Sequence, residues 1–285
     1  MNREIDPVDR QEITRPGAEL DQSSRSVEAP SREPQPLIGR TYAYFLSQAE
    51  LKTMEDIGRF RTVAADDLAQ LRYGGNPDQS RRDLRSLQDQ GLIARRTIWT
   101  GGQRHRLTVF VLTKRGKTLL ERQPGVARQQ KVYAGFVKAR EVHHDAAIYR
   151  MYHTEASQIE RAGGRIRRVV LDYELKQNVY RPLAKARANA GAAGCAEYAR
   201  RQAEIAGQNH LKVVHGKILL PDLRIEYETA DGDPAHVDLE LATRHYRGSS
   251  LRAKAEAGFK MYAPQDSAAG AKPYDPAHMA EIFSF

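Results

Sequence analysis

The chain has 285 residues, enough for one or two domains that each bury their own core. Hydrophobic residues make up 40% and charged residues 28% of the sequence, as in globular proteins, and no apolar run reaches the about 20 residues needed to cross a bilayer. The formal net charge of +9 favours a polyanionic partner, and the single cysteine, Cys195, excludes a disulfide framework or a cysteine-rich zinc site.

Residues 1–40 are predicted to form a tail without a fixed structure. They are rich in Pro, Ser, Glu and Arg and contain no aromatic residue, so they cannot bury enough apolar surface to offset the entropy of ordering. Their six Arg and eight Asp or Glu give a net charge of −2, which leaves +11 on the other residues. They also lack the pattern of a secretory signal, so we expect a cytoplasmic protein that makes no membrane contact.

Two short helical patterns follow the tail. Ser47 and Glu50 have the spacing of a capping box, which predicts a helix over residues 47–59. Leu51, Met54 and Ile57 then fall on one face of this helix. A second pattern places Val63, Leu68 and Leu71 at helical spacing and stops at the Gly74–Gly75 pair, which supplies a turn.

A third helix is predicted over residues 76–91. Asn76 is a suitable helix cap and Pro77 suits the first helical position, while Gly91 ends the pattern. Ser80, Leu84 and Leu87 form its apolar stripe, which has to pack on the first two helices. The opposite face therefore carries polar donors that suit phosphates and the acceptor edge of guanine.

A hairpin with a glycine-rich turn is predicted after Gly91, followed by a closing helix capped by Thr113. Residues 76–117 hold ten Lys or Arg and only three Asp or Glu, so positive charge gathers on the third helix and the hairpin. We therefore expect a winged helix-turn-helix over residues 41–123 that binds double-stranded DNA. Its candidate DNA-binding residues are Gln79, Arg81, Arg82, Arg85, Ser86, Arg95, Arg96, Arg104 and Arg106.

The sequence also allows a role for the winged helix other than DNA binding. The winged helix could serve protein contacts or dimerisation, with the basic residues as an ordinary solvated face. Asp78 and Asp89 also lie on the outward face and weaken its positive field.

The second part, residues 124–285, alternates helices and strands. We expect a helix around residues 132–159, a strand at residues 167–173 and, after an Ala-rich stretch at 184–206 that is either helical or flexible, two strands and a helix. In the strand at residues 237–241, alternation places Val237, Leu239 and Leu241 in the core and Asp238, Glu240 and Ala242 on the other face. The expected fold class is therefore α+β or α/β, with a mixed sheet.

Carboxylates on these strands suggest a metal-dependent phosphodiesterase. Asp222 follows Pro221 at the end of an apolar run, and Glu240 lies on the next strand, so the two could hold Mg²⁺, which activates water and neutralises a phosphate.

In this region the chain resembles the PD-(D/E)XK nuclease-like superfamily and, more specifically, the replication-relaxation family of bacterial proteins. That resemblance implies a winged helix followed by a restriction-endonuclease-like domain over residues 124–285. The residues that carry it are Val142-His-His-Asp145, Pro221-Asp222, Val237-Asp-Leu-Glu240, and Leu251 to Tyr262 with Lys254 and Lys260.

The chain departs from the superfamily motif at one position. Lysine is required two residues after the glutamate, where its ammonium orients the attacking water, and this chain has Ala242. Arg244, Lys254 or Lys260 could supply a charge instead, but arginine stays protonated. The Glu174-Leu-Lys176 triplet precedes the Pro-Asp pair, so we interpret it as a strand exit.

We therefore expect a DNA-binding platform with an inactive nuclease-like site and no cofactor. The alternatives are an Mg²⁺-dependent endonuclease with Asp222, Glu240, Arg244 and Lys254 as catalytic residues, and a protein-interaction adaptor. A homodimer or other DNA-processing proteins stay open as further partners. His143, His144, Asp145 and His153 are expected to be structural, because neighbouring helical positions diverge by about 100°, and Tyr149 and Tyr152 to be core residues.

Overall fold

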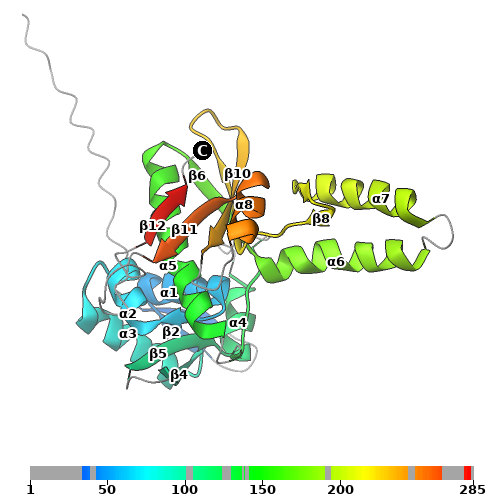
Figure 1. The fold of residues 1–285 in the computed structure, drawn as a ribbon. Coiled ribbons are helices and arrows are strands. Elements are labelled where there is room, and N and C mark those ends of the chain that lie inside the picture. The colour runs from blue at the N-terminus through cyan, green and yellow to red at the C-terminus, as the bar shows by residue number, and fades with distance from the viewer. Residues whose placement is uncertain are drawn as a thin grey trace, which may run out of the picture.

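The computed structural model describes a mixed α+β protein (Figure 1). In the part of the chain that the structure describes, no helix is long and apolar enough to cross a membrane. Arg104 and Arg244 lie outside the described residues. The described ranges are 34–38, 43–100, 105–123, 130–136, 138, 141–189, 194–242, 248–264 and 279–283.

An antiparallel pair of strands opens the described chain. β1 (Gln35–Ile38) pairs with β2 (Ala43–Leu46), with Gln35 opposite Leu46. Part of the predicted tail, residues 1–40, is therefore a strand, and this end of the prediction was wrong. Composition measures only what side chains can bury, whereas backbone hydrogen bonds to a neighbouring strand can order a short segment as well.

The first predicted helix is confirmed as α1 (Gln48–Phe60). Ser47 and Glu50 form the capping box, with the Ser47 N–H donating to the Glu50 carboxylate at 2.7 Å. Met54 and Ile57 are buried on the face that the pattern indicated. The helix ends at Phe60, because the next residue, Arg61, has a φ of 66° that breaks the helical path.

The second pattern divides into three elements. Val63 lies in a strand, β3 (Val63–Ala64), because its backbone pairs with Phe110, so its assignment to a helix was wrong. α2 (Ala65–Asp67) and η1 (Leu68–Arg72) follow, and Gly74 and Gly75 then turn the chain at φ values of 58° and 80°.

α3 (Pro77–Asp89) confirms the third helix. The Asn76 side chain caps it by accepting from the Gln79 N–H at 3.0 Å, and Pro77 stands at its start. Leu84 and Leu87 are buried, so the polar face points outward as predicted.

The predicted hairpin consists of β4 (Ile93–Thr100) and β5 (His105–Leu112), which pair with Ile93 opposite Leu112. β3 joins β5 to give a three-stranded sheet in the order β3-β5-β4. α4 (Lys114–Leu120), capped by the Thr113 hydroxyl, closes this part of the chain.

α5 (Val142–Arg161) begins ten residues later than predicted. The preceding residues are held by tertiary hydrogen bonds that compete with a helix. The Gln130 side chain accepts from the Val169 N–H at 2.9 Å and donates to the Val169 carbonyl, and the Tyr133 N–H donates to the Gly58 carbonyl at 2.8 Å.

α5 packs on both parts of the chain. Tyr149 and Tyr152 are buried against Phe60 of α1, as expected of core residues, and the Tyr149 hydroxyl donates to the buried Asp56 carboxylate at 2.9 Å. Glu155 accepts from Tyr262 and pairs with Lys260 at 2.9 Å. One apolar cluster therefore extends across both sides of residue 123.

Two helices form an arm that projects from the larger sheet (Figure 1). The strand β6 (Arg165–Leu171) leads directly into α6 (Asp172–Asn189), and α7 (Gly194–Gln208) returns beside it. The Ala-rich stretch is thus helical on both sides of residues 190–193. Glu174 and Lys176 lie in the first turns of α6, so their assignment to a strand exit was wrong.

Five strands build a mixed sheet in the order β12-β11-β10-β9-β6, and two short strands, β7 and β8, form a separate antiparallel pair. β10 pairs antiparallel with β9 and parallel with β11. The elements are β7 (Val213–Val214), β8 (Lys217–Ile218), β9 (Leu223–Glu228), β10 (Pro234–Leu241), α8 (Gly248–Glu256), β11 (Lys260–Pro264) and β12 (Met279–Phe283).

Both faces of the large sheet are covered. Leu239 and Leu241 pack toward α5, while Ala242 belongs to a second cluster with residues of α6 and α7. Consequently the polar face of β10 is also buried, with Asp238 8% and Glu240 0% exposed. Asp238 is balanced by Arg224 at 2.6 Å.

Gly116 offers a test of the packing of α4. A Cβ atom at this position would lie 2.1 Å from the carbonyl oxygen of Leu92, so Gly116→Ala should destabilise the protein by about 1–3 kcal/mol through overpacking. Gly207→Ala, in α7 with open space around it, is the matched control and should be neutral or stabilising by about 1 kcal/mol. Urea unfolding midpoints at constant slope measure both, and equal midpoints for the two variants would contradict the packing argument.

Candidate nucleic-acid interface

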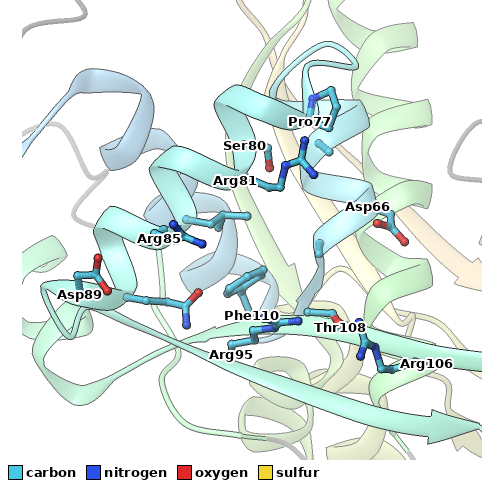
Figure 2. A pocket seen from close by; sticks show the side chains of 14 residues that line it. Asp66, Pro77, Ser80, Arg81, Arg85, Asp89, Arg95, Arg106, Thr108 and Phe110 are labelled. Carbon is cyan, nitrogen blue, oxygen red and sulfur yellow. The ribbon is translucent and has the colours of Figure 1, made fainter.

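A groove of about 680 Å³ lies between α3 and the β4–β5 strands. Arg81 and Arg85 reach it from α3, and Arg95 and Arg106 reach it from the strands, as Figure 2 shows. We call it the arginine groove. Its lining residues are Ala65, Asp66, Ala69, Pro77, Ser80, Arg81, Leu84, Arg85, Gln88, Asp89, Arg95, Arg106, Thr108 and Phe110.

The helical period places two of the arginines. Arg81 and Arg85 are four residues apart on α3, so they share one face, and the burial of Leu84 and Leu87 turns that face outward. Arg81 forms an ion pair with Asp78 one turn earlier, on the exposed surface, where such pairs contribute little to stability. Arg81 can therefore exchange this ion pair for a contact with a ligand at little cost.

Strand alternation places the other two. Arg95 lies opposite Phe110 and Trp99 lies opposite Arg106, so these four side chains share the face of the hairpin that borders the groove. The opposite face, with Leu107 and Val109, packs on α5.

Acidic residues reduce the charge of the groove without cancelling it. Asp66 and Asp89 line it together with the four arginines, so the lining keeps an excess of positive charge. The carboxylate of Asp83, by contrast, is buried behind α3 and accepts from the Gln79 amide at 2.6 Å.

Several predicted DNA-binding residues lie outside the arginine groove. Gln79 is engaged by Asp83 and accepts from Arg82 at 2.7 Å, and Ser86 accepts from Gln90 at 3.2 Å. Arg96 alternates with Arg95 and its guanidinium donates to the Arg95 carbonyl. The exposed Arg82 and Arg96 therefore do not line the groove, and Arg96, opposite Val109, lies on the other face of the hairpin.

Other groove residues were absent from the sequence-based prediction. Thr108 and Phe110 lie at alternate positions of β5 with Arg106, so the strand period was the signal that could have found them. Gln88 lies one turn after Arg85 on α3. Asp66 comes from α2, and no local pattern connects it with the hairpin.

The second candidate site brings Asp222, Glu240 and Lys254 together. β9 and β10 pair with Leu223 opposite Leu239, so Asp222, directly before β9, lies next to Glu240 of β10. The Asp222 carboxylate accepts from the Leu241 N–H at 2.9 Å. Lys254 of α8 lies 2.8 Å from the Glu240 carboxylate and donates to the Leu220 carbonyl.

His144 completes this charge arrangement from α5. It lies 3.4 Å from Asp222 and 3.6 Å from Asp145. Burial alone would lower the pKa of His144, but hydrogen bonds with both carboxylates outweigh it and raise the pKa to about 10. Burial also acts to raise the pKa of Asp222, yet His144 and the Leu241 N–H hold it below its usual value. Both groups are therefore charged at neutral pH.

These contacts do not fit a preformed Mg²⁺ site. His144 already balances Asp222 and Lys254 already balances Glu240, so a divalent ion would have to compete with two internal cations. Among the described residues, no group of three or more His, Cys, Asp or Glu side chains is arranged to hold a metal ion.

The other histidines of α5 do not join this site. His153 stacks edge-on against Tyr149, and burial lowers its pKa to about 4. His143 is exposed, and partial burial lowers its pKa. A structural role for the group fits these positions, except that His144 reaches Asp222, on the loop before β9.

Comparison with protein-family models, curated proteins and solved structures finds no match to this chain.

The pKa of His144 predicts a pH-dependent stability. The pKa of His144 is about 10 in the folded protein and 6.5 in the unfolded chain. Charged His144 therefore contributes fully to the free energy of unfolding below about pH 6.5, and this contribution declines as the pH rises toward 10. The stability difference between the wild type and His144→Gln should therefore shrink between about pH 6 and about pH 10. Denaturation midpoints across this range measure it, with the exposed His215→Gln as control. A pH-independent difference would show that His144 is not charged in the fold.

Proposed function

We propose that the protein binds double-stranded DNA through the arginine groove. The observation that carries the proposal is the convergence of four arginines from two separate elements, α3 and the β4–β5 hairpin, on one groove. Guanidinium groups bind phosphate oxygens in a bidentate manner, and a row of them suits a nucleic-acid backbone.

In this proposal one DNA strand runs along the groove. Arg81 and Arg85 contact its phosphates from α3, and Arg95 and Arg106 contact them from the hairpin. The exposed face of α3, with Arg82, then enters the adjoining major groove, whose width of about 12 Å accepts a helix of about 10–12 Å diameter.

The arrangement of elements supports a more specific assignment. We interpret α1, α2–η1 and α3 with the β4–β5 hairpin as a winged helix-turn-helix. The five-stranded mixed sheet and its helices would be the nuclease-like domain of a replication-relaxation protein, used in the control of replication, DNA transfer or transcription. The internal partners of Asp222 and Glu240 favour a non-catalytic platform for this second part.

Removal of two groove arginines tests DNA binding. Arg85→Ala with Arg95→Ala should weaken affinity for duplex DNA by a similar factor whatever its sequence, and should flatten the slope of log affinity against log salt by about 0.9 per lost phosphate contact. Fluorescence anisotropy with labelled duplex measures both quantities.

The matched control is Arg200→Ala with Arg201→Ala on α7, which removes the same charge away from the groove. Equal losses in the two double variants would indicate a nonspecific effect of net charge. Unchanged affinity and slope in the groove variant would favour a protein-contact role for this surface.

The partnered carboxylates predict an absence of cleavage. We expect no cutting of duplex, nicked or single-stranded DNA above background with Mg²⁺, because His144 and Lys254 already balance Asp222 and Glu240. Gel analysis of plasmid and oligonucleotide substrates, with and without chelator, measures this. Mg²⁺-dependent cutting that disappears in Asp222→Ala would replace the platform proposal with an endonuclease.

A further inference from the structure

Trp99 is the only tryptophan of the chain, and its side chain is 70% exposed. It lies near the end of β4, on the hairpin that borders the arginine groove. A single exposed apolar residue is ordinary. The exposure of Trp99 suggests a function only because the residue lies next to the arginines of the groove.

The strand register aligns Trp99 with the groove. Trp99 lies directly opposite Arg106, and it shares the strand face of Arg95, four residues earlier. At about 3.3 Å per residue, the ring stands roughly 13 Å beyond Arg95 along the strand. It therefore stands level with Arg106, at the end of the row of arginines on the groove-facing side of the hairpin.

The chemistry of the ring differs from that of the groove. Arginines bind phosphates, whereas an indole ring gains little from phosphate and much from the apolar faces of sugars and bases. Aromatic and other apolar side chains next to phosphate-binding arginines are used in this way by proteins that contact DNA grooves.

We propose that Trp99 is a DNA-contact residue that packs its ring against the sugars and base edges flanking the segment held by the arginine groove. This proposal rests on the proposed DNA binding and adds to it a contact that does not depend on charge. Arg106, directly across the strand pair, anchors a phosphate and so fixes the depth at which the ring meets the duplex.

The 285-residue chain gives a direct readout, because all of its tryptophan emission comes from Trp99. Titration with unlabelled duplex should lower the emission and saturate at the same stoichiometry as anisotropy measured with labelled duplex. Anisotropy that reports binding while the emission stays constant would overturn the contact but leave the proposed function standing.

Substitution separates this contact from the electrostatic ones. Trp99→Ala should weaken binding by about 5- to 100-fold with an unchanged salt slope, whereas Arg95→Ala should also flatten the slope. Trp99→Phe should recover part of the affinity because it restores a ring. Tyr180→Ala removes an exposed aromatic of α6 and should leave affinity unchanged.

The outcomes distinguish failure of the Trp99 contact from failure of the proposed DNA binding. Wild-type affinity in Trp99→Ala would overturn the role of the ring alone. A loss that comes with a flatter salt slope would also overturn it, since the residue would then act through its neighbouring arginines. Absence of binding by the wild-type protein at any salt concentration would overturn both the contact and the proposed function. Circular dichroism is the control for folding, and each variant should be folded because the substituted side chain is exposed.

Discussion

The fold depends on the burial of α5 between two groups of elements. On one side Tyr149 of α5 donates to Asp56, which also accepts from Arg72 at 2.7 Å, so a buried carboxylate joins α1, η1 and α5. On the other side Glu155 accepts from Tyr262 of β11. A buried carboxylate is tolerated only when its hydrogen bonds are satisfied, so these contacts fix the rotation of α5 as well as its position. The apolar cluster around them then makes the small sheet and the large sheet parts of one packed body.

The two candidate sites stand in opposite electrostatic situations. The charges of Asp222, Glu240, His144 and Lys254 are satisfied within the protein, so this site gains little from an added ion. The arginine groove has more arginines than carboxylates, and its arginines are on exposed surfaces, so its field is available to a ligand. This contrast favours the groove over the carboxylates as the place where the protein meets another molecule.

Local patterns predicted much of the fold and part of the groove. The capping box at Ser47, the cap at Asn76 and the stripe of Leu84 and Leu87 each act within a few residues, and each was found. The start of α5 was not found, because it is set by Gln130 bonding to a strand 39 residues away. The pairing of His144 with Asp222 spans even more chain, and it needs the sheet to be assembled first. The periodicity of a sequence predicts which face of a helix or strand is buried. The element that packs against that face is determined by the whole fold.

The shared core has an evolutionary consequence. A segment that ended near residue 123 would leave Phe60 of α1 without the cover of Tyr149 and Tyr152 of α5 and would lose Val132 from the shared apolar cluster. Such a segment is a poor unit for gene fusion or domain shuffling, because its recipient would have to provide a new covering helix. The elements from α1 to α4 and the large sheet are therefore expected to be inherited together.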